Sequence, residues 1–140
     1  MKSRLNIRER MKRSITMRRG EIILRSDFTH MGSQSQISRL LTDFVAEGRL
    51  VRLGYGIFAK ARISSISGQP VPREPLEVLA EEAFMRLRIE AKPGKAQRDY
   101  ASGQSPQIPV QAVFDTGRRR ISRELMVGNR KVRYENDYNR

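Results

Sequence analysis

Residues 33–48 read Ser33-Gln34-Ser35-Gln36-Ile37-Ser38-Arg39-Leu40-Leu41-Thr42-Asp43-Phe44-Val45-Ala46-Glu47-Gly48, and they carry the signals of one complete amphipathic helix. Ser33 and Gln36 have the spacing of a capping box, and Gly48 suits the left-handed conformation that ends a helix. Apolar side chains recur at helical spacing at Ile37, Leu40, Leu41, Phe44 and Val45. One face of this helix is therefore expected to lie against a core.

The opposite face of the helix carries short or forked polar side chains. These are Ser35, Gln36, Ser38, Arg39 and Thr42. Such groups suit hydrogen bonding to base edges in a DNA major groove, with Arg39 the best candidate for a guanine contact. An ordinary solvated surface has a similar composition, so the neighbouring segments must decide between the two interpretations.

The flanking segments predict a winged helix-turn-helix. Residues 2–14 are expected to form a first helix, with Leu5, Ile7, Met11 and Ile15 as its apolar stripe. Residues 21–25 suit a strand, and Ser26 is expected to cap a short helix over 27–31 that Gly32 connects to Ser33. Residues 49–53 and 56–60 then suit a hairpin that turns at Gly54 and Tyr55.

This arrangement predicts which side chains hold the DNA backbone. They are Ser33, Gln34, Arg4, Arg8, Arg49, Arg52, Tyr55, Lys60, Arg118, Arg119 and Arg120. Phosphate contacts of this kind fix the register of a protein on the duplex. For Tyr55, packing over the hairpin is an equal alternative, and the C-terminal arginines could instead be edge-strand charges that prevent aggregation.

The composition changes after Lys60, which predicts two domains, a winged helix-turn-helix over residues 1–62 and a small module over 63–140. Ser, Gly and Pro residues over 62–72 indicate a loop. A helix over 75–87 carries acidic residues, either as a plain solvated face or as a docking surface. Strands over 89–91 and 110–115, a short helix over 95–101 and a basic hairpin turning at Gly128-Asn129 are expected next. The fold class is therefore α+β.

The net charge of +13 over 140 residues points to a polyanionic partner, most often nucleic acid. The sequence has no cysteine and one histidine, His30, so neither a triad nor a multi-histidine metal site can be assembled. No catalytic motif or cofactor-binding motif stands out, and we expect neither enzyme activity nor a cofactor. No membrane span or signal peptide is visible, which predicts a cytoplasmic protein without a membrane partner.

Several motifs resemble the winged-helix domain of AbiEi-type antitoxins. They are Ser26-Asp27-Phe28, Gly32-Ser33, the helix end Glu47-Gly48, and the run Arg49-Leu50-Val51-Arg52-Leu53-Gly54-Tyr55-Gly56-Ile57-Phe58. The whole chain resembles short bacterial proteins described as type IV antitoxin-like. The resemblance implies a cytoplasmic DNA-binding repressor of its own operon, encoded beside a nucleotidyltransferase-like toxin. Phe58 stands where that family often has tyrosine.

Two functions from different classes follow. The first is a sequence-specific regulator of double-stranded DNA, an antitoxin-type autorepressor that acts as a homodimer on an inverted repeat. The alternative is a protein-interaction module that neutralises a partner toxin and binds DNA only weakly and without specificity. RNA binding is a third interpretation, and the small number of aromatic residues argues against it.

Overall fold

The computed structural model describes residues 5–136, and the chain divides into two compact units between Glu74 and Pro75. The α+β class predicted from the sequence is confirmed. The first unit extends past the expected boundary at residue 62, because the segment expected to be a loop forms a further strand. That strand, β4 (Pro70–Pro72), pairs antiparallel with the end of β3 (Ile57–Ile63).

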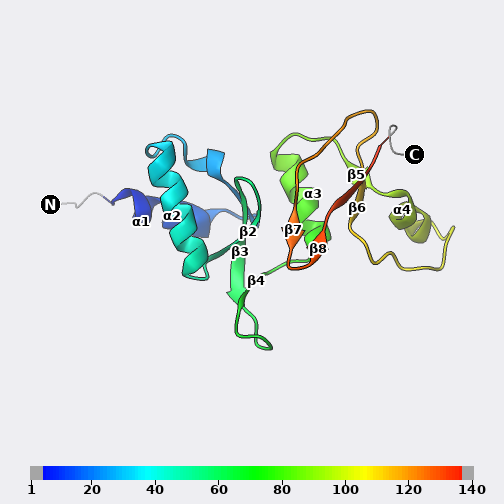
Figure 1. The fold of residues 1–140 in the computed structure, drawn as a ribbon, viewed down its shortest axis with the longest axis horizontal. Coiled ribbons are helices and arrows are strands. Elements are labelled where there is room, and N and C mark those ends of the chain that lie inside the picture. The colour runs from blue at the N-terminus through cyan, green and yellow to red at the C-terminus, as the bar shows by residue number, and fades with distance from the viewer. Residues whose placement is uncertain (1–4, 137–140) are drawn as a thin grey trace. The chain divides into compact units, whose positions relative to one another are not determined.

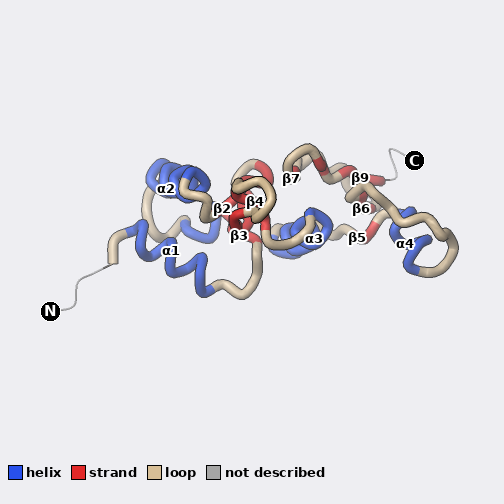
Figure 2. The backbone as a smooth tube through the Cα atoms, turned by 90° about the horizontal axis from the view of Figure 1, so that it is seen from below, coloured by secondary structure: helices blue, strands red, loops and turns tan. Residues whose placement is uncertain are grey.

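The first unit follows the predicted order of helix, strand, helix, helix and hairpin (Figure 1). Its elements are α1 (Ile7–Met17), β1 (Ile22–Leu24), the 3-10 helix η1 (Arg25–Phe28), α2 (Gln34–Ala46), β2 (Leu50–Gly54), β3 and β4. The sheet order is β1-β3-β2, with both neighbours antiparallel to β3. Figures 1 and 2 both show the two α-helices on one side of these strands.

Helix α2 forms as the sequence predicts. The Ser33 side chain accepts from the Gln36 amide, and the Gln36 side chain accepts from the Ser33 amide, which completes the capping box. Glu47 is the C-cap, and Gly48 has φ of 78°, a conformation that side chains disfavour. The Ser33 hydroxyl thus satisfies the Gln36 amide at the helix start, and the Gly48 and Arg49 amides donate to the Val45 and Phe44 carbonyls at its end.

The core of the first unit lies between α1, α2 and the sheet. It is built from Met11, Ile15, Ile23, Phe28, Ile37, Leu41, Phe44, Leu50 and Phe58, all of them buried. Leu40 and Val45, also expected on the buried face of α2, are half-buried and pack at its margin. Phe28 and Phe44 are completely buried, so they contribute the largest apolar areas removed from water.

Three local expectations for the first unit are wrong. Helix α1 begins at Ile7 because the Asn6 side chain caps it, and Leu5 before it is 44% exposed. Ser26 is not a cap: the Asp27 carboxylate accepts from the Leu24 amide instead, and η1 begins at Arg25, two residues earlier than expected. The hairpin turns at Tyr55 and Gly56, since Gly54 remains in β2 and Gly56 takes the positive φ.

The second unit packs one helix against a small sheet. Its elements are α3 (Leu76–Arg86), β5 (Lys92–Pro93), α4 (Lys95–Ala101), β6 (Val113–Asp115), β7 (Met126–Val127), β8 (Arg130–Lys131) and β9 (Arg133–Glu135). The sheet order is β5-β6-β9, with β9 parallel to β6. Phe84 of α3 meets the Phe114 ring edge-on at 5.0 Å and the Tyr134 ring at 6.0 Å. Burial raises the pKa of Tyr134 to about 12.

The strands of the second unit differ in extent from those expected. Residues 89–91 form no strand, and the run 110–115 is extended only over Val113–Asp115. The hairpin turn at Gly128-Asn129 is confirmed, but only Met126–Val127 and Arg130–Lys131 pair across it. The arginine triplet lies before this hairpin in a turn, which Asp115 and Thr116 hold through hydrogen bonds to the Gly117 amide and the Arg119 carbonyl.

Candidate nucleic-acid interface

The outward face of α2 presents a continuous polar row. Ser35, Ser38, Arg39 and Thr42 are spaced as one face of a helix, and all except the half-buried Ser38 are exposed. The Arg39 side chain forms no ion pair or hydrogen bond with residues 5–136, so its five N–H donors face solvent. Ser33 and Gln34 are exposed at the start of the helix, where backbone N–H groups favour anions.

Three of the predicted base-reading residues already use part of their hydrogen-bonding capacity. The Ser35 hydroxyl shares a hydrogen bond with the Ser33 hydroxyl at 3.2 Å. The Gln36 carbonyl oxygen accepts from the Ser33 amide at 3.0 Å and from the Ser33 hydroxyl at 3.2 Å. The Thr42 hydroxyl donates to the Ser38 carbonyl at 3.0 Å. Gln36 can therefore offer its NH2 group as a donor, and Thr42 can offer its hydroxyl oxygen as an acceptor.

The tip of the β2–β3 hairpin carries a second cluster, formed by Arg25, Arg52 and Tyr55. Tyr55 is 69% exposed, and the Arg25 guanidinium lies 4.8 Å from its ring centroid and donates to its hydroxyl at 3.1 Å. That hydrogen bond lowers the pKa of Tyr55. The Arg52 guanidinium lies 6.0 Å from the ring of Phe58 on the neighbouring strand. The cluster thus places one cation against an exposed phenol and a second over the Phe58 ring of the same hairpin.

Sequence reasoning missed Arg25. It follows β1 directly, and β1 pairs with β3 so that Leu24 lies opposite Ile57. The Arg25 amide then donates to the Gly56 carbonyl at 3.0 Å, which brings this arginine to the hairpin turn. If the register of the β1–β3 pair had been deduced from the two apolar runs, it would have placed Arg25 at the hairpin turn.

Arg8 and Arg49 lie at the end of α2, where both bind Glu47. The Arg8 guanidinium donates to the Glu47 carboxylate at 2.5 Å and lies 5.0 Å from the Phe44 ring centroid. Arg49 reaches the same carboxylate oxygen at 3.3 Å. These hydrogen bonds lower the pKa of Glu47 to about 2. The two arginines, expected on the DNA backbone, are therefore engaged within the unit and hold α1 and β2 to α2.

Lys60, another expected backbone contact, is also engaged within the unit. It lies on β3, is half-buried, and donates through Nζ to the Arg18 carbonyl at the end of α1. A cation at this position stabilises the carbonyls that a helix end leaves unpaired. Lys60 therefore ties α1 to the sheet. Arg4, another expected backbone contact, lies outside the described residues.

Replacing Glu47 with glutamine should destabilise the protein at neutral pH and have little effect in acid. Because the folded state lowers the carboxylate pKa from its usual 4.5 to about 2, the ion pairs contribute above pH 4.5 and are lost as the pH falls toward 2. Urea denaturation at pH 7, 4 and 2.5 measures this. Glu90→Gln, an exposed carboxylate outside any ion pair with a described residue, controls for the change in net charge. A wild-type minus Glu47→Gln difference that does not vary with pH would contradict the assignment.

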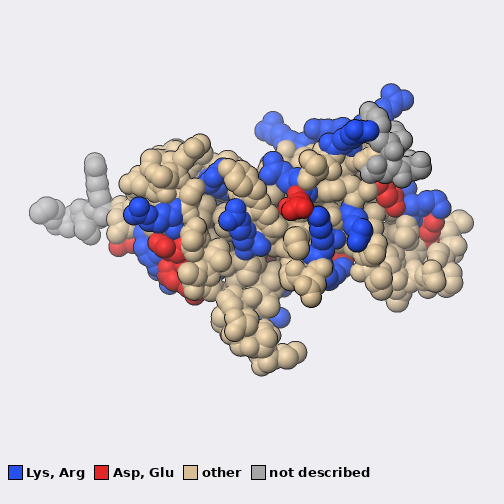
Figure 3. Space-filling view, in the orientation of Figure 1, with Lys and Arg blue, Asp and Glu red and all other residues tan. Residues whose placement is uncertain are grey.

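The second unit carries the remaining predicted backbone residues, Arg118, Arg119 and Arg120, in the turn and loop after β6, all exposed. Figure 3 shows Lys and Arg side chains gathered along one edge of this unit. Two cations of the hairpin that follows form ion pairs, Arg130 with Glu77 and Lys131 with Glu124 at 2.8 Å. The arginine triplet itself lies outside any strand.

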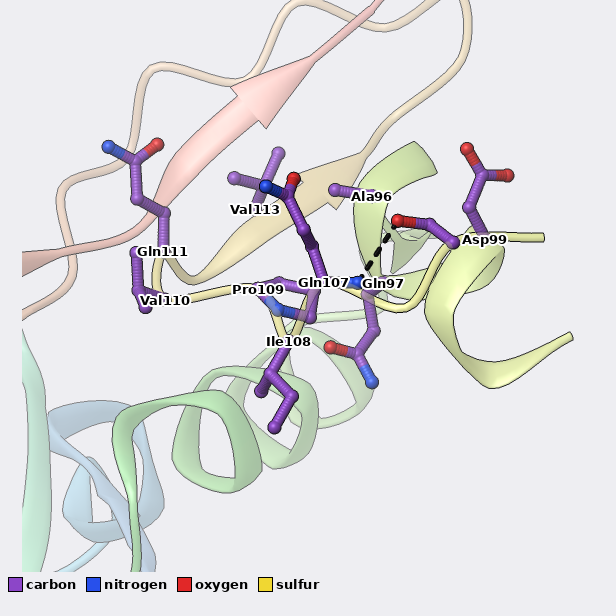
Figure 4. A pocket seen from close by; sticks show the side chains of 10 residues that line it. Ala96, Gln97, Asp99, Gln107, Ile108, Pro109, Val110, Gln111 and Val113 are labelled. Carbon is purple, nitrogen blue, oxygen red and sulfur yellow. Dashed lines mark hydrogen bonds between the residues drawn. The ribbon is translucent and has the colours of Figure 1, made fainter. Parts of the chain in front are cut away.

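A pocket in the second unit lies between α4 and the segment over 105–111 (Figure 4). Its polar groups are mostly neutral amides, among them Gln97, Gln107 and Gln111. Asp99 is its single ionisable lining residue, and Lys95 binds that carboxylate at 3.3 Å. The lining therefore offers hydrogen bonds but no pair of groups for acid–base catalysis.

His30 is exposed, and within residues 5–136 no three His, Cys, Asp or Glu side chains gather as a metal ion would require. Among the same residues, none of the helices combines the length and apolar character needed to cross a membrane.

The described residues define a basic α+β protein of two units. In the first unit, helix α2 has a polar, exposed outward face, and the β2–β3 hairpin carries arginine and tyrosine. The chain belongs to the Family of unknown function (DUF6088), whose sequence profile matches residues 6–139. No curated protein and no solved structure is similar enough to match it.

Proposed function

We propose that the protein is a sequence-specific regulator of double-stranded DNA that acts in the cytoplasm as an antitoxin-type autorepressor of its own operon. In this proposal the first unit is a winged helix-turn-helix. The observation that supports it most strongly is helix α2, which is capped at Ser33 and presents a polar, exposed outward face. Ser35, Arg39 and the Gln36 amide would reach base edges in the major groove.

The hairpin cluster supports the same function. Arg25 lies beside the exposed ring of Tyr55 at the hairpin turn, and Arg52 lies over the Phe58 ring of the same hairpin, where a wing contacts the DNA backbone or minor groove. The net charge of +13 supplies the long-range attraction to a polyanion. Arg118, Arg119 and Arg120 would add phosphate contacts from the second unit.

Fluorescence anisotropy tests the proposal. The full chain is titrated against the DNA upstream of its own gene and against scrambled DNA of the same length, over a salt series. We expect the upstream DNA to bind at least roughly a thousandfold more tightly, as specific binders do. Equal binding of both DNAs, with an equally steep loss at high salt, would reduce the interaction to counterion release and refute the proposal.

A second candidate is neutralisation of a partner enzyme, such as a nucleotidyltransferase-like toxin. The observation that favours it is the pair Ile108 and Val110, which are 70% and 82% exposed on the segment beside the amide-lined pocket. Exposed aliphatic residues of this kind suit a protein contact. Co-purification with the product of the adjacent gene, and inhibition of that product, test it. An adjacent enzyme that stays fully active in the presence of the protein would exclude it.

A further inference from the structure

Helix α1 has an exposed face in addition to the one that packs in the core. Arg10, Arg13, Ser14 and Met17 are spaced as one helix face, and with Leu5 and Met31 they line a shallow hollow. Met17 is 70% exposed and Leu5 44% exposed, although both are large apolar residues. Arg10 and Arg13 are exposed as well, and neither forms an ion pair within residues 5–136.

This mixture suits a protein partner better than DNA. A phosphate backbone would bind the arginines alone. It would not bury the exposed methionine and leucine side chains. A surface that carries carboxylates beside apolar side chains would satisfy both kinds of group at once. The hollow is therefore complementary to an amphipathic segment that carries acidic and apolar side chains.

The chain itself contains such an element on α3. Val78, Glu81, Glu82 and Met85 are spaced as one face of that helix, opposite the buried Leu79, Ala80 and Ala83. Val78 is 46% exposed, Met85 is 75% exposed, and Glu81 is exposed. The two faces thus have the same spacing and opposite charge, and each presents one strongly exposed methionine.

We infer that the α1 hollow of one copy binds the Val78–Met85 face of α3 in a second copy. The apolar side chains at Met17 and Met85 would be buried in this contact, and Arg10 and Arg13 would face Glu81. Complementary charge of this kind fixes the partner and the register of an interface. The inference goes beyond DNA binding and does not depend on it, because none of the residues assigned to the contact belongs to the outward polar face of α2.

Sedimentation velocity on the full chain at tens of micromolar tests the contact. The wild-type chain should self-associate. Arg13→Glu and Glu81→Arg should each weaken self-association at least about tenfold, because each places like charges opposite one another. An equimolar mixture of the two variants should restore it, since Glu at position 13 then faces Arg at position 81 of the other chain.

Matched controls separate this contact from a general effect of charge. Arg19→Glu and Glu90→Arg make the same charge changes at exposed positions that belong neither to the lining of the hollow nor to α3, and should leave self-association unchanged. Restoration in the mixture also shows that both variants are folded. A monomeric wild type, variants that associate like the wild type, or a mixture that stays dissociated would each overturn the inference. The sedimentation experiment contains no DNA, so its outcome is independent of the DNA affinity that tests the proposed function.

Discussion

Replacing Phe44 with alanine is expected to lower the free energy of unfolding of the first unit by about 3–5 kcal/mol, enough to unfold a marginal domain. The side chain is completely buried in the core with Phe28 and Leu41, so truncation leaves a cavity between α2 and α1. It also removes the ring over which Arg8 lies, at 5.0 Å. Urea denaturation followed by circular dichroism measures the loss.

The matched control is Tyr55→Ala, which truncates an aromatic side chain that is 69% exposed. That change should cost less than about 1 kcal/mol, as surface substitutions usually do. If the two variants lost similar stability, the core described for the first unit would be wrong.

Arg39→Ala is expected to weaken binding to the cognate DNA by about 1–3 kcal/mol, with a smaller effect on random DNA. Arg39 is exposed on the polar face of α2 and forms no ion pair within the described residues, so its loss should leave the fold intact. A bidentate contact to a guanine is made only at the right sequence, which is why the two DNAs should differ.

Arg119→Ala provides the comparison, since it removes the same side chain from the turn after β6. A residue that only contacts phosphate should weaken both DNAs alike and reduce the salt dependence. Anisotropy titrations of both variants against both DNAs measure this. If the two variants behaved identically, the division between base-reading and backbone-holding residues would be wrong.

Helix α2 could be predicted almost completely because its signals are local. The capping box, the apolar period and the glycine at its end lie within sixteen consecutive residues, Ser33 to Gly48. The hairpin was found for the same reason, although its turn lies one residue later. The position of the turn depends on which glycine adopts a positive φ. The sequence offers both Gly54 and Gly56, and Gly56 is the one that adopts it.

The partners of Arg8 and Lys60 could not be predicted, because they lie far apart in the sequence: Arg8 binds Glu47, and Lys60 binds the Arg18 carbonyl. Arg25 reaches Tyr55 through the β1–β3 pair, so only a deduced register of that pair would have shown this contact. The pairing of β4 with β3 likewise joins a proline-containing segment to a strand end, where an edge position tolerates Pro70 and Pro72. For these contacts the sequence shows the charge or the composition of one partner, but it does not show which distant residue or strand that partner contacts.

The attachment of Glu47 to two arginines has a consequence for the entropy of recognition. Arg8 from α1 and Arg49 beside β2 hold the last turn of α2 from two directions, and Ser33 with Gln36 fixes its first turn. A helix restrained at both ends loses little conformational entropy when a ligand binds its outward face. More of the contact energy made by Ser35 and Arg39 would then remain as affinity, because less is spent on ordering.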